Sequence, residues 1–547
     1  CRAVQGLPLG IELAAAWAHQ LSPAEIAAAI ERSFDFLATT RRDVSPRQRS
    51  LRAVFDWSWG RLNAEEQQTF ARLAIFPGPF TRAAAQEVAE AGLSTLAGLA
   101  DKSLVWRRGD LYQLHQVAQQ FGREKLEQAG GLAAAQTAHG RYYARFLARQ
   151  AAELQGHDQQ AGLDAIAREE ENVAAAWRQM AASGALGDLA AATDGLYHFL
   201  AIRSRFHQGV ELFAAARRAA QPLAAADPTA RGVFARSLAR EGRFLSFLSR
   251  YAEAKPLLHE GLAIARELNE AEEMAFALNH LGGVARMEGD LALAGRLIEE
   301  CLALRRQTGS RGGQAVALLE LAGIAFMAGE YAAAISRCQK GLPLAEEAGD
   351  RQTAAHLLTG LSLSCRELGE WEAALDYGRR GQAIYEDLGD RYGIIQAALT
   401  LGELSRRLGQ VAQAREFHAQ AVRISQEIGF RSGEADGDYR LGQIEADAGE
   451  VEAALSHFRQ ALTLAYEIEE LPLALDALLE IGLLQIGMGD TTSAWAILSF
   501  VSAQPQLAEA GRARLSPILA GWGGQSDPAS RPADLTLSRA VALAGAG

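Results

Sequence analysis

The sequence has 547 residues, of which 49% are hydrophobic, 22% are charged and 7% are aromatic, and its formal net charge is −12. This hydrophobic fraction excludes an intrinsically disordered chain, and the acidic balance excludes a chain whose main role is to coat nucleic acid. No uninterrupted apolar run approaches the ~20 residues of a membrane-spanning helix, so we predict no membrane association. The four cysteines form no Cys-x-x-Cys pair, which favours a reducing, cytoplasmic location over a disulfide scaffold.

Lysine is scarce, and the residues beside the four lysines show whether the sequence contains a phosphate-binding loop. Lys102, Lys125, Lys255 and Lys340 each follow a residue other than glycine. A Walker A motif needs Gly-Lys-Ser/Thr, because the lysine must reach the phosphates from the end of a glycine-rich turn, so this chain contains none. The sequence also lacks His-Glu-x-x-His and Gly-x-Ser-x-Gly. We therefore predict no catalytic residue, metal site or resident cofactor, and we expect three cysteines to fill the core: Cys301, Cys338 and Cys365.

Two short helices are predicted in the first 44 residues. Pro8 suits the first turn of a helix, where its missing N–H costs nothing, and an apolar face continues through Trp17. Ser22-Pro23-Ala24-Glu25 is a capping-box pattern that starts a second helix. A polar break follows at residues 41–47.

Residues 46–128 form one compact block in this interpretation. Four helices come first, and Asn63 and Thr81 stand at the starts of two of them. The segments 103–106 and 111–114 then alternate as short strands around a turn, and His115 opens a closing helix. Helices followed by strand, turn and strand predict a winged helix.

The charge of this block bears on whether it binds DNA. Residues 46–128 contain eleven basic and nine acidic residues, a balance of +2. That is a weak electrostatic footprint for a domain that must neutralise several phosphates, so we expect no direct binding of nucleic acid.

The stretch at 129–233 is predicted to be a helical linker or a set of atypical repeats. Arg205-Phe206 parallels Arg250-Tyr251, which indicates one additional unit ahead of the regular array, set apart by Pro222 and Pro228. We interpret the carboxylate run Glu169-Glu170-Glu171 as a solvated helix face.

A 40-residue repeat dominates the rest of the chain. A glycine followed by a polar residue recurs at this step from Gly289 to Gly489, and an alanine follows each glycine by five residues. One step earlier, Ser249 takes the place of the glycine. Seven copies in register predict stacked helix–turn–helix hairpins that bury their apolar faces on their neighbours.

The sequence of one repeat explains its expected shape. Leu278 and Leu281 recur at helical spacing and define a first helix. Gly289 stands where the end of a helix needs a left-handed residue, and Asp290 can cap the next helix by accepting backbone N–H groups. The small Gly282 lets the two helices approach closely.

This pattern resembles the tetratricopeptide repeat, in a 40-residue variant, through the Leu-Gly pair of the first helix and the alanine of the second. The resemblance implies an all-α fold in which the hairpins form a right-handed superhelical solenoid, with the first helices on the concave side. Its inward positions form either a solvated helix face or a groove for a protein, a peptide or a small-molecule inducer. By that register they include Asn279, Arg286, His356, Arg366, Arg406, Asp436 and Tyr439.

A second resemblance concerns the N-terminal part. Gly6-Leu7-Pro8-Leu9 and the Ala-rich helix after it resemble the GLPL motif of NB-ARC domains, the nucleotide switches of signal-transduction ATPases with numerous domains (STAND proteins). Leu114-His115-Gln116 resembles the Met-His-Asp motif of their winged-helix subdomain, with Gln116 in place of the aspartate. The resemblance implies that Gly6, Pro8 and His115 contact ADP or ATP in a longer parent protein whose nucleotide-binding domain precedes this chain. The alternatives are a plain helix-start proline for Pro8 and a buried, helix-capping histidine for His115.

Five segments are therefore predicted. They are an NB-ARC remnant at 1–44, a winged helix at 45–128, a linker or atypical repeats at 129–233, the tetratricopeptide array at 234–505, and a cap and tail at 506–547 with a short closing helix at 535–543. This order resembles bacterial regulators of the antibiotic-regulator and maltose-activator type. It implies the sensor half of a nucleotide-switched transcriptional or signalling regulator, without ATPase activity in this chain. The alternative is a passive tetratricopeptide scaffold that assembles other proteins.

Overall fold

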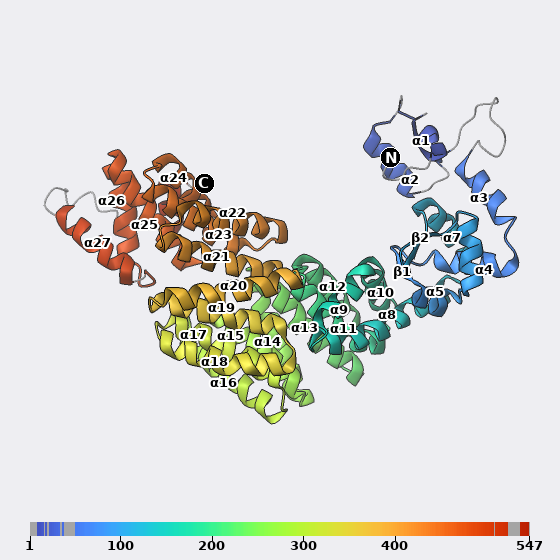
Figure 1. The fold of residues 1–547 in the computed structure, drawn as a ribbon, viewed down its shortest axis with the longest axis horizontal. Helices are drawn as coiled ribbons and strands as arrows, with labels where there is room; N and C mark the ends of the chain where they lie inside the picture. The colour runs from blue at the N-terminus through green and yellow to red at the C-terminus, as the bar shows by residue number, and fades with distance from the viewer. Residues whose placement is uncertain are drawn as a thin grey trace. The chain divides into compact units, whose positions relative to one another are not determined.

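The computed structural model describes residues 8–15, 17–18, 21–32, 36–37, 50–507, 509–522 and 536–545. The described chain is almost entirely helical, as predicted, with one small sheet (Figure 1). It divides into two compact units that alternate along the sequence. The first consists of residues 1–152, 161–196 and 218–233, and the second of residues 153–160, 197–217 and 234–547.

The first unit begins with the two predicted short helices, α1 (Pro8–Ala15) and α2 (Pro23–Arg32). Ser22 and Glu25 form the expected reciprocal cap of α2: the Glu25 N–H donates to Ser22 Oγ at 3.3 Å, and the Ser22 N–H donates to Glu25 Oε2 at 2.9 Å. Asn63 and Thr81 cap their helices as predicted. The helices of the following block are α3 (Leu51–Trp59), α4 (Ala64–Leu73), α5 (Arg82–Ala89), α6 (Leu93–Asp101) and α7 (Gln116–Gln128).

A three-stranded antiparallel sheet lies within this block, in the order β1-β3-β2. Its strands are β1 (Phe80–Thr81), which the sequence pattern did not predict, β2 (Trp106–Arg108) and β3 (Leu111–Gln113). The first predicted strand, at 103–106, is displaced toward the C-terminus. The reason is Ser103, whose left-handed backbone (φ 59°) ends the turn after α6 before an extended strand can start.

The interpretation of the carboxylate run is wrong for Glu169. This residue lies between α9 (Gln159–Arg168) and α10 (Glu170–Ser183), where only 2% of it is exposed. Its carboxylate accepts a hydrogen bond from the Tyr143 hydroxyl of α8 (Leu132–Leu154) at 2.6 Å, and burial raises its pKa. Asn172 of α10 accepts the Gly78 N–H at 3.0 Å, so these buried polar groups hold the turn before β1 on α8 and α10. The helix α11 (Leu186–Ile202) follows.

The second unit contains the repeat array, drawn in green to red in Figure 1. Successive antiparallel helices pair across short turns, and each hairpin packs on the next. The helices are α12 (Phe206–Ala220), α13 (Pro228–Phe247), α14 (Tyr251–Leu268), α15 (Ala271–Met287), α16 (Leu291–Gln307), α17 (Arg311–Met327), α18 (Tyr331–Ala348), α19 (Arg351–Glu367), α20 (Trp371–Leu388), α21 (Arg391–Arg407), α22 (Val411–Ile428), α23 (Arg431–Asp447), α24 (Val451–Glu467), α25 (Leu471–Met488) and α26 (Thr491–Ser502).

The turns of the array follow the predicted chemistry. Gly289 has a φ of 84°, and the equivalent glycines up to Gly489 are also left-handed. Ser249 takes the same conformation, with a φ of 59°. The Asp290 carboxylate accepts the Leu293 N–H at 2.9 Å and so caps α16. A Cβ at Gly282 would overlap the side chain of Ile298, which confirms the close approach of α15 and α16.

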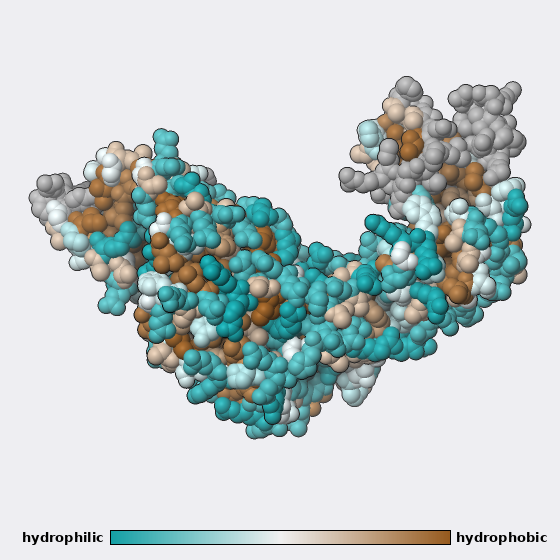
Figure 2. Space-filling view, viewed as in Figure 1, coloured by the Kyte–Doolittle hydropathy of each residue, from teal (hydrophilic) through white to brown (hydrophobic). Residues whose placement is uncertain are grey.

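The C-terminal end of the array has a core of its own. The predicted closing helix is present as α28 (Leu537–Leu543), and Ala540 and Val541 are buried in the same apolar cluster as residues of α24–α26; α27 (Glu509–Trp522) adds Leu515. The helix α25 is long and apolar enough to cross a membrane by length and composition, but half of it is buried, and it contributes to this core. Hydrophobic surface gathers over α25 and α26 in Figure 2. The three predicted core cysteines are buried: Cys301, Cys338 and Cys365.

Candidate functional site

The residues expected to contact a nucleotide lie at helix starts or outside the described residues. His115 caps α7, since its Nδ1 accepts the Val117 N–H at 3.3 Å, and the residue is buried. Its ring centroid lies 5.8 Å from that of Trp106. Pro8 is the first residue of α1, whereas Gly6 lies outside the described residues. A contact with a nucleotide stays a prediction for all three.

The predicted inward arginines all have carboxylate partners within the array. Arg286 lies 3.4 Å from Glu320, and Arg366 lies 2.6 Å from Glu367. The Arg406 guanidinium bridges Glu403 and Asp447, each at 3.0 Å. Their charges are therefore largely neutralised inside the solenoid.

The other predicted inward residues are mostly engaged with their own helices. Asp436 pairs with Arg440 of the next turn at 3.1 Å, and the Tyr439 hydroxyl accepts a hydrogen bond from Gln443 at 3.1 Å. Asn279 is 5% exposed, and its side-chain oxygen has no hydrogen-bond partner in the part of the chain that the structure describes. His356 differs from these, because it joins a cluster with residues from other hairpins.

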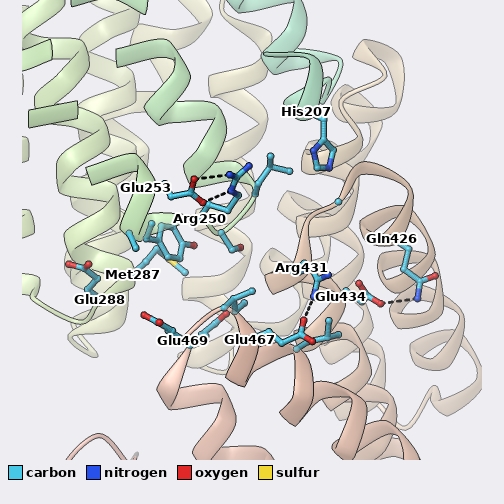
Figure 3. A pocket seen from close by; sticks show the side chains of 18 residues that line it. His207, Arg250, Glu253, Met287, Glu288, Gln426, Arg431, Glu434, Glu467 and Glu469 are labelled. Atoms are coloured by element: carbon cyan, nitrogen blue, oxygen red, sulfur yellow. Dashed lines mark hydrogen bonds and ion pairs between the residues drawn. The ribbon is translucent and has the colours of Figure 1, made fainter. Parts of the chain in front are cut away.

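A pocket of about 800 Å³ opens where early and late turns of the array meet (Figure 3). One wall consists of the 248–253 turn that starts α14 and the end of α15 at Met287 and Glu288, and His207 of α12 lies against Gly429 of the opposite wall. The facing wall comes from α22, α23 and α24 and from the turn before α25. Residues far apart along the chain thus face one another across one cavity.

The pocket is lined by polar and apolar surface in similar measure, and most of its charges are paired along each wall. Arg250 holds Glu253 through two hydrogen bonds of 2.7 Å, Arg431 pairs with Glu467, and Gln426 donates to Glu434 at 3.0 Å. On the facing wall, Glu470 accepts a hydrogen bond from Ser432 at 2.8 Å, and burial raises its pKa.

Tyr251 and Glu470 connect the two walls electrostatically. Burial, together with the charge of Glu470, raises the pKa of Tyr251 to about 12. The cavity therefore offers hydroxyl, carboxylate and guanidinium groups, which suit recognition of a polar ligand.

A second cluster lies on the inner face of the array, and we call it the Arg243 site. It is defined by Arg243 and Phe247 of α13, His280 of α15, His356 of α19 and Tyr392 of α21. The Arg243 guanidinium lies 3.7 Å from the centroid of the Phe247 ring, and that ring lies 5.2 Å from Tyr392. The rings of His356 and Tyr392 are 6.2 Å apart.

The two histidines of the Arg243 site are neutral at physiological pH. Burial, aided by the charge of Arg243, lowers the pKa of His356 to about 4 and that of His280 well below its ordinary value. His356 Nδ1 shares a hydrogen bond of 2.6 Å with the Tyr385 hydroxyl. Arg243 is thus a positive charge that acts on both of these neutral side chains.

Four members of the Arg243 site were missed from the sequence. His280 lies one position after Asn279, and Arg243 lies 40 residues before Gly283, so both fall on repeat positions that the predicted groove did not include. A scan of every inner repeat position for aromatic and basic residues finds them. Tyr392 lies in the first turn of α21 and Phe247 at the end of α13, outside the helix centres from which the groove was predicted.

Two further features bear on the chemistry of the described residues. Among the described residues, no group of three or more His, Cys, Asp or Glu side chains could hold a metal ion. Burial raises the pKa of Cys301 and Cys338 to about 12, which keeps both thiols protonated and unreactive.

Comparison with known proteins adds a family match and a partial relative. Residues 313–387 match the tetratricopeptide repeat family. A stretch of 141 residues is 39% identical to a Mycobacterium tuberculosis protein named "Putative HTH-type transcriptional regulator". That match covers 24% of this chain and 16% of the relative, so the chain spans only a small part of the relative's length.

Solved structures align over longer stretches at low identity. A STAND protein with a tetratricopeptide repeat sensor from Pyrococcus horikoshii aligns with 94% of this chain and 75% of its own, at 14% identity and a TM-score of 0.49. A Rap protein complexed with competence and sporulation factor aligns with 62% of this chain and 97% of its own, at 13% identity and a TM-score of 0.45. With the family match and the repeated helical hairpins, the array is a tetratricopeptide-type solenoid.

Proposed function

We propose that this chain is the ligand-sensing part of a nucleotide-switched regulator. In this proposal the array binds an inducer or a protein partner, and the 45–128 block, as a winged helix, relays that binding to a nucleotide-binding domain of a longer protein. The observation that carries it is the pocket of Figure 3, whose walls belong to hairpins far apart in the sequence. A ligand that contacts both walls favours one arrangement of the array by its differential affinity, which is what a sensor requires.

Two further observations support a regulatory relay. A 141-residue stretch is similar to a protein named as a transcriptional regulator. Within the first unit, the buried Glu169 and Asn172 anchor the turn at 77–81 on α8 and α10. These contacts hold the 45–128 block against α8 and α10, so a movement of these helices would also move the block, as a relay requires.

The test fills the pocket with a side chain and needs no knowledge of the ligand. Ala252 is exposed, lies second in α14 and lines the pocket, so Ala252→Trp occupies the cavity without disturbing the core. Ala292 has the same place in α16 and the same exposure but does not line this pocket, so Ala292→Trp is the matched control. The readout is release of a fluorescent ADP analogue from the full-length parent protein.

We expect Ala252→Trp to change the release rate at least fivefold and Ala292→Trp to leave it as in the wild type. A parent protein that binds no nucleotide, or two variants with equal release rates, would overturn the proposal. Either result would favour the passive tetratricopeptide scaffold.

A further inference from the structure

The Arg243 site brings a charge and several rings together from four helices. Between Arg243 and Tyr392 lie almost 150 residues of chain, yet Phe247 contacts Tyr392 and also stacks on Phe206, with ring centroids 4.3 Å apart. Tyr392 in turn lies 5.0 Å from the ring of Phe430. Arg243, His280, His356 and Tyr392 are each partly exposed, so a solute can reach the polar groups above this aromatic wall.

Arg243 has no carboxylate partner among the described residues. No hydrogen bond or ion pair joins its side chain to any other residue in the described ranges, and its Nε is buried. Neighbouring inner arginines are paired: Arg240 donates to both carboxylate oxygens of Glu273, and Arg286 lies 3.4 Å from Glu320. The Phe247 ring offsets only part of the hydration that a partly buried guanidinium loses, so a ligand that supplies an anion would be favourable.

We propose that the Arg243 site binds the carboxylate of a ligand with an apolar or aromatic body. The guanidinium can donate two parallel N–H groups to a carboxylate, which is its preferred bidentate geometry. The partly exposed Tyr392 ring offers the surface against which the apolar body packs, and Phe247, stacked between Arg243 and Phe206, supports it from behind. The inference rests on the proposed sensing function, because it names the chemistry of the ligand that the array senses.

The surroundings select a single negative charge over several. The charges of Arg286, Glu320 and Asp390 also act on Tyr392, and Arg286 is already paired with Glu320, so Arg243 is left to meet one negative charge while Asp390 opposes a second. The neutral histidines add no positive charge. A carboxylate is thus preferred over a phosphate, and it can come from a small acid or from the C-terminus of a peptide.

The experiment is calorimetric titration of this chain with matched pairs of probes. N-acetylphenylalanine is compared with N-acetylphenylalanine amide, which lacks the charge, and a pentapeptide ending in phenylalanine is compared as free acid and as amide. Phenyl phosphate tests the alternative anion. We expect each acid to bind at least tenfold more tightly than its amide, and the tighter of the two acids identifies the source of the carboxylate.

Two arginine variants locate the binding. Arg243→Met removes the charge but keeps an apolar stem over Phe247, and it should weaken binding of the acid at least tenfold. Arg423→Met is the control on the exposed side of α22, and it should bind like the wild type. Equal affinity for acid and amide, no binding of either acid, tighter binding of phenyl phosphate or unchanged binding by Arg243→Met would each overturn the proposal.

The melting temperature of the ligand-free variant separates binding from a structural role. Because Arg243 has no carboxylate partner among the described residues and methionine keeps an apolar stem over Phe247, Arg243→Met should melt at or above the temperature of the wild type. A decrease of several degrees would make Arg243 a structural residue and overturn the proposal. These measurements use the chain alone, whereas nucleotide release tests the switch in the parent protein, so either can fail without the other.

Discussion

Two stretches of the inner face, residues 240–290 and residues 400–480, differ in how their charged side chains are paired. In the later stretch most inner charges are paired: Glu403 with Arg406 and Arg407, Asp436 with Arg440, Glu445 with Arg415, and Glu480 with Arg514. In the earlier stretch Arg240 and Arg286 are paired in the same way, but Arg243 lacks a carboxylate partner among the described residues. The 40-residue frame is the same in both. The 40-residue repeat pattern therefore determines the core of the array but not the residues of its inner face. Those residues either stabilise the solenoid or bind a ligand.

The largest expected effect tests the structural side of this comparison. Glu403 is 3% exposed and accepts hydrogen bonds from Arg406 Nε at 3.0 Å and Arg407 Nε at 2.8 Å. Glu403→Gln leaves Arg407 without this counter-charge and leaves Arg406 with Asp447 alone, so we expect it to lower the free energy of unfolding in urea by about 3 kcal/mol. The exposed Glu416→Gln on α22 is the control, with a change within about 0.5 kcal/mol. A loss below about 1 kcal/mol for Glu403→Gln would contradict the prediction, because it would show that the paired charges of the later stretch contribute little to stability.

The pH dependence of the later stretch has two components of opposite sign. The neighbouring arginines hold the pKa of Glu403 at about 2, although burial opposes them, so its stabilising effect is present above the unfolded pKa near 4.5 and is lost as the pH falls toward 2. Burial raises the pKa of Asp476 to about 6. Its ionisation therefore costs stability, and this cost develops as the pH rises from about 4 to 6.

Asp476→Asn isolates the second component. At pH 7 we expect the variant to be more stable than the wild type by about 1 to 2 kcal/mol, after allowing for the partial exposure of the side chain, and near pH 3.5 we expect the two to be equal. Urea unfolding at both pH values measures the difference. A difference that does not change between them would show that Asp476 ionises as freely in the folded protein as in the unfolded chain.

The array and its sites differ in how far local sequence determines them. Gly289 and Asp290 predict a helix end and a helix start because the chemistry of both acts within a few residues, and the structure confirms them. The isolation of Arg243 depends on which carboxylates approach it from α15, α19 and α21, which sequence spacing does not give. Glu169 shows the same limit, because Tyr143 and the turn at 77–81 decide its burial.

The smallest expected effect sharpens the comparison at the turn that starts α14. Ser249 holds a left-handed backbone that serine adopts at a cost, where the later repeats have glycine. Ser249→Gly should raise the free energy of unfolding by about 0.5 kcal/mol, the relief of that strain less the greater freedom of glycine in the unfolded chain, and Gly289→Ser should lower it by a similar amount. Ser249 also lines the pocket of Figure 3. A more stable Ser249→Gly would show that this serine does not contribute to stability, which supports a role of the earlier stretch in binding. A less stable variant would show that Ser249 stabilises the repeat array.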